Sequence, residues 1–281
     1  MRIGAHVRIE NGLVSTVERA VESGCETIQI FAGNPNAWKS ASIKDDVTEQ
    51  FRQHIAAAGI RPVVIHTAYL LNLASPDEDN YAKSTSALAD SMHRAGIIGA
   101  QYVVTHIGSH KGEGFEASIH RIWAAIRTAL ETSNGEAMLL LENSAGSGNS
   151  IGSRLEEIAE ILDGLNDIGE RLGICLDTAH LWGAGYDLSS EDEINRRVSE
   201  IDDVIGLDRL KVIHLNDTLV ELGAKRDRHE NIGNGKIGIA GFNVIVNHPA
   251  LDDKTGIIET PHTVGSVHDD VEVLKILRID G

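Results

Sequence analysis

The chain of 281 residues contains only two cysteines, Cys25 and Cys175, and they lie far apart in apolar stretches. Such a pair predicts buried thiols and argues against the disulfide framework of a small secreted protein. The first twenty residues contain no apolar run suited to a signal peptide, and no apolar run reaches membrane-spanning length. We therefore expect a cytoplasmic protein.

Basic residues are also far fewer than acidic residues. The chain has 25 Lys and Arg residues against 42 Asp and Glu residues, which gives a formal net charge of -17. This balance argues against a protein that coats nucleic acid through a broad basic face. It still allows a nucleic-acid enzyme whose positive charge is local or is supplied by metal ions.

Several common signatures are missing. No G-x-G-x-x-G follows the first predicted strand, which disfavours dinucleotide binding. No Ser-His-Asp or Cys-His arrangement is evident, so nothing indicates a covalent protein intermediate. No linker or low-complexity segment divides the chain, which predicts one domain over residues 1–281.

Short apolar runs alternate with amphipathic helical segments along the chain. Eight runs predict strands, at residues 1–7, 26–31, 61–66, 100–106, 137–143, 171–177, 210–215 and 256–260. Helices are predicted at residues 13–24, 45–60, 80–96, 115–132, 153–165, 191–205 and 267–277, with a long loop after residue 215. Since each parallel crossover needs a helix, the pattern predicts an α/β fold, a single-domain (β/α)8 TIM barrel, with an open doubly wound sheet as the alternative.

Six consecutive predicted strands carry a His, Asp or Glu at or next to their last position. These residues are His66, His106, Glu142, Asp177, His214 and Glu259, and His180, Asp227 and His229 follow in adjoining loops. In a parallel barrel all carboxyl ends point to one face, so these nine side chains should converge around one mouth. Buried carboxylates repel one another, and no Lys or Arg ends any of these strands. Metal ions are therefore the expected compensation.

The mixture of imidazole and carboxylate favours zinc or manganese over magnesium or calcium, which prefer oxygen ligands. Nine ligands are too many for one four-coordinate ion and fit a cluster of two or three ions. Three zinc ions would bring six positive charges against the four negative charges of Glu142, Asp177, Asp227 and Glu259. The excess of about two positive charges predicts a site that attracts an anion such as phosphate.

Motifs along the whole chain resemble those of the endonuclease IV family of apurinic/apyrimidinic (AP) endonucleases. In order, they include "GAHV", "IFAGNPNAW", "VVIHTAYLLNLASPD", "VVTHIGSH", "LLLENSAGSGNSIG", "CLDTAHLWGAGYD", "IHLNDT", "KRDRHENIGNGKIG" and "IIETP". The combination of "LENSAG", "CLDTAH" and "DRHENIGNGKIG" is specific, although each motif would be weak alone.

The resemblance implies a TIM barrel that holds three zinc ions, with manganese as an alternative at one position. By position in the motifs, His66, His106 and Glu142 would hold the first ion. Glu142 would also bridge to a second ion, bound by Asp177, His214 and Glu259. His180, Asp227 and His229 would hold the third.

The implied reaction is hydrolysis of the phosphodiester on the 5′ side of an abasic site in duplex DNA. It leaves a 3′-hydroxyl and a 5′-deoxyribose phosphate. Glu142 would orient and help to deprotonate the attacking water. The resemblance thus implies damaged double-stranded DNA as the partner, and we expect a monomer.

Four residues are candidates for contacts with DNA. Tyr69 matches the family's position for an aromatic that enters the base stack, with a surface tyrosine as the alternative. Asn36 stands where the family commonly has Arg, so an arginine beside the abasic site is absent here. Arg226 and Arg228 flank Asp227 and are either phosphate contacts or part of a solvated loop.

Two other functions fit parts of the pattern. A sugar isomerase or epimerase on the same barrel also places His, Asp and Glu at strand ends, but it needs only about one metal ion per chain. A non-catalytic, metal-dependent DNA-binding protein is suggested by Asn36. A metal count separates the first alternative from the nuclease, and incision of an abasic duplex separates the second.

Overall fold

The computed structural model describes residues 1–31, 33–38, 41–133, 135–261 and 266–279, and eight of its strands close into a barrel. Neighbouring strands are parallel, in the order β1-β10-β7-β6-β5-β4-β3-β2. The strands are β1 (Arg2–His6), β2 (Thr27–Phe31), β3 (Val63–His66), β4 (Tyr102–His106), β5 (Met138–Glu142), β6 (Leu172–Asp177), β7 (Leu210–His214) and β10 (Thr255–Ile258). The predicted TIM barrel is confirmed, and the alternative of an open sheet is wrong.

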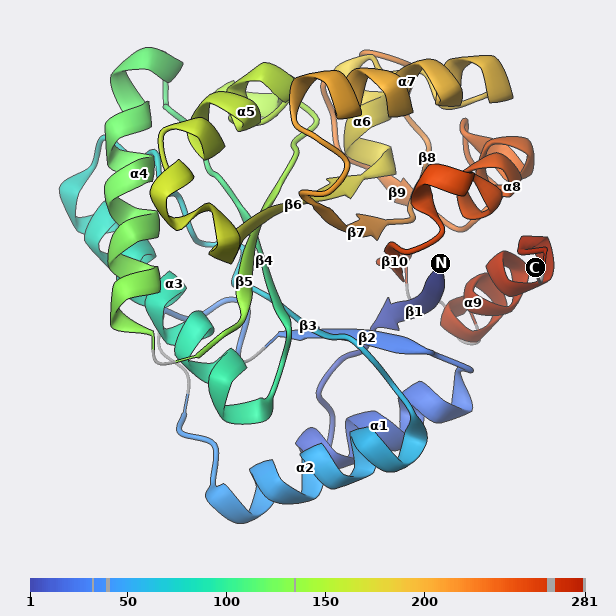
Figure 1. Ribbon diagram of the computed structural model, residues 1–281, viewed down its shortest axis with the longest axis horizontal. Coiled ribbons are helices and arrows are strands. Elements are labelled where there is room, and N and C mark those ends of the chain that lie inside the picture. Colours follow the sequence, from blue (N-terminus) through green and yellow to red (C-terminus); the bar gives the residue numbers. More distant parts are fainter. Residues whose placement is uncertain (32, 39–40, 134, 262–265, 280–281) are drawn as a thin grey trace.

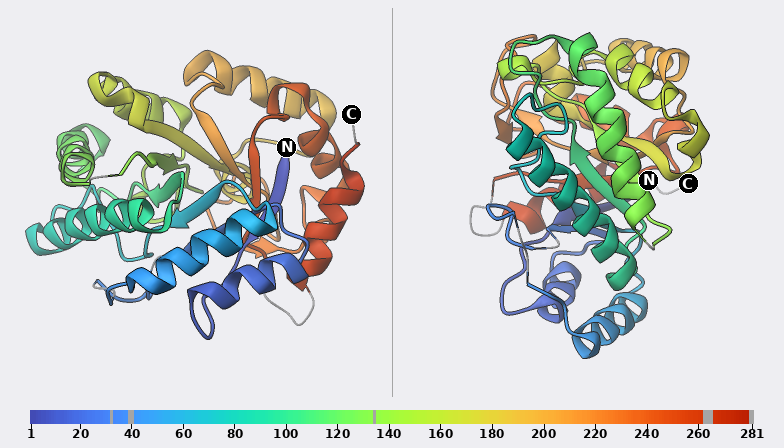
Figure 2. Two further views of the ribbon diagram at one scale, coloured as in Figure 1. Left: turned by 60° about the horizontal axis from the view of Figure 1, so that its bottom comes forward. Right: turned by 90° about the vertical axis from the view of Figure 1, so that its left-hand side faces the viewer.

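The helices form an outer layer around the strands, as Figures 1 and 2 show. They are α1 (Leu13–Glu22), α2 (Asp45–Ala58), α3 (Glu78–Ile98), α4 (Phe115–Thr132), α5 (Leu155–Asp163), α6 (Thr178–Ala184), α7 (Glu191–Val204), α8 (Gly238–Asn247) and α9 (Ser266–Leu277). In the described part of the chain, none of these helices is both long enough and apolar enough to cross a bilayer.

The prediction of one long loop between β7 and β10 is wrong, because this segment contains α8 and a small hairpin. The α8 sequence "GIAGFNVIVN" combines glycines with β-branched residues, all weak helix formers. The helix nevertheless buries Phe242, Ile245 and Val246 in the hydrophobic core. Tertiary burial therefore overrides local propensity here. The hairpin consists of β8 (Asp217–Thr218) and β9 (His229–Glu230), which pair antiparallel.

The barrel interior has an apolar layer that lies directly beneath the polar strand ends. The layer consists of one residue from each of six strands: Val64, Val104, Leu140, Cys175, Val212 and Ile257. Each of them comes two residues before a predicted metal ligand, which are His66, His106, Glu142, Asp177, His214 and Glu259 respectively. Because side chains alternate between the two faces of a strand, every apolar residue and its ligand point into the barrel together. Cys175 thus belongs to the inner layer, and both cysteines are buried free thiols, as predicted.

An ion pair between Glu26, just before β2, and Arg278 lies at the opposite end of the barrel. The guanidinium donates two hydrogen bonds to the carboxylate, with N–O distances of 2.7 and 2.9 Å. The backbone N–H of Ile3 donates a third, at 3.0 Å. Burial by itself raises the pKa of Glu26, but the bonds from Arg278 and Ile3 outweigh it and lower the pKa from 4.5 to about 2.

We expect Glu26→Gln to lower the free energy of unfolding by roughly 1–3 kcal/mol at pH 7, because it removes a charged acceptor from three donors. Since the folded-state pKa of Glu26 is depressed to about 2, this contribution is complete above pH 4.5. It is lost as the pH falls toward 2. Urea denaturation of parent and variant between pH 7 and pH 2.5 measures the difference. Glu18→Gln, at an exposed carboxylate of α1, is the control. A difference independent of pH would contradict the role of the charge.

Candidate metal centre

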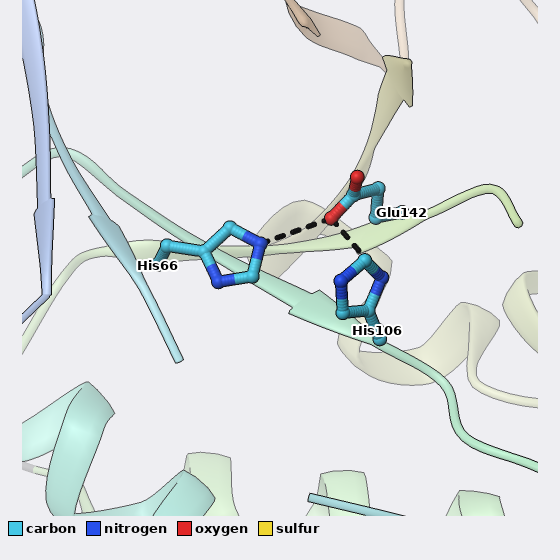
Figure 3. Close-up of side chains that lie close together, drawn as sticks. All are labelled: His66, His106 and Glu142. Atoms are coloured by element: carbon cyan, nitrogen blue, oxygen red, sulfur yellow. Dashed lines mark hydrogen bonds and ion pairs between the residues drawn. The ribbon is translucent and has the colours of Figure 1, made fainter. Parts of the chain in front are cut away.

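The nine predicted ligands meet at the carboxyl ends of the barrel strands, in three overlapping groups. The first group is His66, His106 and Glu142. The oxygen Glu142 Oε2 lies 3.1 Å from His66 Nε2 and 3.3 Å from His106 Nδ1. Figure 3 shows both rings pointing at this oxygen. The second oxygen, Glu142 Oε1, lies 3.2 Å from His214 Nδ1, so the carboxylate of Glu142 faces two sets of histidines.

The second group is Glu142, Asp177, His214 and Glu259. Its centre is His214 Nδ1, which lies 3.3 Å from Glu259 Oε2 and 3.8 Å from Asp177 Oδ2. His214, Glu142 and Asp177 are almost fully buried, at 0–1% exposure. The motif-based assignment of these residues to one ion is therefore compatible with their positions.

The third group comprises Asp177, His180, Asp227 and His229. Asp227 bridges the two rings, with oxygens 3.2 Å from His180 Nε2 and 3.1 Å from His229 Nε2. Asp177 Oδ2 also lies 3.5 Å from His229 Nε2. Asp177 therefore stands between the second and third groups, a position that the sequence did not reveal.

Outer hydrogen bonds fix which ring nitrogen of each histidine faces the centre. His66 Nδ1 and His180 Nδ1 donate to the backbone oxygens of Thr67 and Asn143, at 2.7 and 3.0 Å. Because a carbonyl oxygen only accepts, each of these nitrogens carries the hydrogen. In a neutral ring the other nitrogen then turns a lone pair toward carboxylates, which repels unless a cation lies between them.

His229 shows the same arrangement. Its Nδ1 lies 3.4 Å from the backbone oxygen of Glu259, and its Nε2 is buried without a hydrogen-bond partner in the described structure. A buried nitrogen that makes no hydrogen bond but lies 3.1 and 3.5 Å from the oxygens of two carboxylates is in the environment of a metal ligand. The donor set therefore fits divalent ions with nitrogen and oxygen ligands.

The carboxylates of the centre are stabilised by neighbouring positive charge. Burial alone raises the pKa of Glu142, but His106 and His214 hold it well below its usual value. Burial alone lowers the pKa of His180, but Asp177 and Asp227 raise it well above the usual value. The carboxylates thus remain ionised and attract either protons on the histidines or cations. Metal ions that replace those protons would release them on binding.

Three side-chain amides that were not singled out in the sequence hold the ligands in place. Asn216 donates to Asp177 Oδ2 at 2.6 Å and accepts from the backbone N–H of Glu259 at 2.7 Å. Asn143 accepts from the backbone N–H of Asp177 at 2.6 Å. Both asparagines closely follow a ligand, in "LEN" and "HLN", and that adjacency is the signal that could have identified them.

Gln29 is the third amide and lies inside β2. Its nitrogen donates to Glu259 Oε1 at 2.5 Å, and its oxygen accepts from His214 Nε2 at 2.9 Å. Since an ionised carboxylate only accepts, Glu259 determines how the amide is oriented. The amide in turn leaves His214 Nδ1 to face the three carboxylates of the second group.

The candidate DNA contacts lie around the centre at different distances. Tyr69 is 62% exposed and lines two adjoining cavities, one of about 330 Å³ over the ligands and one of about 570 Å³ beside them. Its ring centroid lies 5.1 Å from that of Phe31. Asn36, Arg226 and Arg228 are exposed on loops and are not among the described residues that line these two cavities.

Comparison with known proteins identifies the family. A protein-family model described as a xylose isomerase-like TIM barrel matches residues 17–277. A probable endonuclease 4 of Methanoculleus marisnigri is 46% identical over 260 residues, which cover 92% of each chain. A probable endonuclease 4 of Halothermothrix orenii is 43% identical over 281 residues, the full length of both chains. The chain belongs to the endonuclease IV family.

A solved endonuclease IV shares the fold closely. The crystal structure of endonuclease IV from Thermus thermophilus superimposes with a TM-score of 0.89 at 33% identity, covering 99% of this chain and 98% of that one. The family inferred from the sequence motifs is therefore confirmed. The individual endonuclease IV ligand positions remain predictions that the geometry supports.

We expect Asn216→Leu to weaken zinc binding by about 10–100-fold at the second group, because Asp177 and Glu259 lose their shared amide. Competition with a chromophoric chelator measures the affinity of each protein. Asn243→Leu, at an exposed position of α8, is the matched control and should bind zinc like the parent. Equal zinc affinity in Asn216→Leu and the control would show that the amide does not support the ligands.

Proposed function

We propose that the protein is a zinc-dependent AP endonuclease of DNA repair. It would hydrolyse the phosphodiester 5′ to an abasic site in duplex DNA and leave a 3′-hydroxyl and a 5′-deoxyribose phosphate. Membership of the endonuclease IV family confirms the predicted enzyme class, a phosphodiester hydrolase that cleaves DNA. The substrate, the products and the identity of the metal belong to the proposal.

The observation that carries the proposal is the position of Glu142. Its two oxygens face separate histidines, and its carboxylate is 1% exposed among His66, His106 and His214. We assign it to two of three zinc ions, with manganese as an alternative at one position. The full ligand set would be His66, His106, Glu142, Asp177, His180, His214, Asp227, His229 and Glu259.

Bound zinc would polarise the phosphate oxygens and lower the pKa of water enough to supply a nucleophile at neutral pH. The protein's own residues would do the rest. Glu142 would orient the attacking water and help to deprotonate it. Asp177, which lies near His214 of the second group and His229 of the third, would keep these two groups in a fixed relation.

Residues at the rim would receive the DNA. Tyr69 is exposed and lines both cavities, so its ring would be available to stack on a base. Arg226 and Arg228 place positive charge beside Asp227 and would contact phosphates. These two positive charges would allow local contact with DNA although the net charge of the chain is -17. The cytoplasmic location and the monomeric state stay predictions.

The alternative drawn from the sequence, a sugar isomerase or epimerase, shares the barrel that the matching family model describes as xylose isomerase-like. The third group argues against it, because one metal ion does not need Asp177, His180, Asp227 and His229 in addition to the first two groups. Elemental analysis of the purified protein, with a nicking assay on an abasic duplex, tests the choice. About three zinc ions and a single 5′ incision support the nuclease, whereas about one ion and no incision support the isomerase. Zinc-dependent binding of abasic DNA without incision would indicate the non-catalytic alternative.

We expect Glu142→Gln to reduce incision by about 10²–10⁴-fold or more, because the neutral amide neither accepts the proton nor offers two anionic oxygens. Single-turnover incision of an abasic oligonucleotide measures the rate, and circular dichroism checks that the barrel persists. Glu156→Gln, at an exposed carboxylate of α5, is the control and should cut like the parent. Activity in Glu142→Gln equal to the control would count against the assigned role.

We expect Asn36→Arg to tighten binding to abasic duplex DNA several-fold, because it restores a cation on an exposed loop where the family commonly has one. The salt dependence of binding should steepen by about one phosphate contact. Fluorescence anisotropy at several salt concentrations measures both effects. Asn243→Arg adds the same charge on the remote helix α8, and identical behaviour of the two variants would mean that the loop does not reach DNA.

A further inference from the structure

Asp217 is a fully buried carboxylate that belongs to none of the three groups. Both of its oxygens accept hydrogen bonds from backbone N–H groups. Oδ1 accepts from Thr218 at 2.8 Å and Ile237 at 3.0 Å, and Oδ2 accepts from Gly233 and Gly235 at 3.0 Å and from Gly238 at 3.2 Å. Five N–H donors around one carboxylate stabilise its negative charge. The loop of residues 231–238 is therefore wrapped around Asp217.

The same residue forms one arm of the β8–β9 hairpin. Asp217 pairs with Glu230, and Thr218 pairs with His229. The backbone oxygen of Arg228 accepts from Leu219 N at 3.2 Å and from Thr218 Oγ1 at 3.0 Å. His229 lies in the opposite arm, and Asp227 comes two residues before it. Asp217 thus ties the loop that follows β9 to the strand that holds the backbone of His229.

The other end of the loop is tied independently. Asp270 accepts from Asn231 Nδ2 at 2.7 Å and from Ile232 N at 3.1 Å, and it also accepts from Thr260 Oγ1 at 2.6 Å. Loss of the bonds to Asp217 would therefore leave the start of the loop attached to α9. The effect of changing Asp217 should be confined to the hairpin and the glycine-rich half of the loop.

We propose that Asp217 is the positioning residue of the third group: it holds the hairpin so that Asp227 and His229 face His180. The inference rests on the proposed metal ligands. In Asp217→Asn, the side-chain NH2 turns toward backbone donors, and some of the five N–H groups lose their acceptor. The third ion should then bind about 10–100-fold more weakly, while the first and second groups, which lie on the barrel strands, keep their ions.

The test is a zinc titration of the purified full chain in chelator-buffered solutions, with the bound metal counted by mass spectrometry. The parent should hold three ions and Asp217→Asn two at the same free zinc. Raising free zinc by about 10–100-fold should restore the third ion and, in parallel, incision. Restoration by zinc separates a positioning role from simple damage to the fold.

A second variant disturbs the same contact from the loop side. In Gly235→Ala the new Cβ would lie 2.3 Å from Asp217 Oδ1 and 2.5 Å from the backbone oxygen of Thr218. The loop must therefore move away from Asp217, while the carboxylate itself is retained. Gly235→Ala should also bind the third ion more weakly and keep the first two. This variant tests the inference if Asp217→Asn yields no folded protein. Gly169→Ala is the control, because its nearest contact would be an ordinary 3.6 Å, to Asn166 Oδ1.

Three ions of parental affinity in both variants would overturn the inference and leave the proposed function intact. Equal weakening of all three ions would also overturn it, since Asp217 would then support the whole fold. A parent that binds fewer than three ions would overturn the metal assignment and this inference with it.

Discussion

Mutual repulsion among four carboxylates that share one end of the barrel is the constraint on which the site depends. Glu142 and Asp177 are almost completely withdrawn from water, and Glu259 and Asp227 lie against the same histidines. Each of them would be costly to bury alone. The five imidazoles offset this cost only by carrying protons or by sharing cations with the carboxylates. The outer hydrogen bonds of His66, His180 and His214 orient the rings for the second arrangement.

The barrel brings these groups together through its strand geometry. On six strands an apolar side chain points inward and a polar one follows two residues later on the same face. The apolar layer fills the interior below the strand ends. The polar side chains that follow it therefore face the mouth of the barrel. Stability and chemistry therefore use adjacent layers of the same strands. A shift of one residue in the register of any strand would remove its ligand from the centre.

This geometry explains how much could be predicted from the sequence. The barrel and the convergence of the nine side chains follow from a two-residue period and from strand direction, both of which can be read locally. Gln29 could not be found this way, because its role comes from contacts with Glu259 and His214, far away in the chain. The same holds for Asp217, whose partners become visible only when the loop has closed around it. Helix α8 was not predicted because glycines and β-branched residues favour helix weakly, and the burial of Phe242, Ile245 and Val246 that stabilises it is a tertiary effect.

The two ends of the barrel perform separate tasks. Arg278 holds Glu26 and also donates to the backbone oxygen of Met1 at 2.9 Å, so the first and last described segments meet at the end of the barrel opposite the metal centre. Segments that lie this close, on a face without a catalytic duty, are good places for covalent change. A short peptide bridge could join them and new ends could be opened in an outer helix–strand connection on that same side. Such a permuted chain would approach DNA with an unaltered mouth.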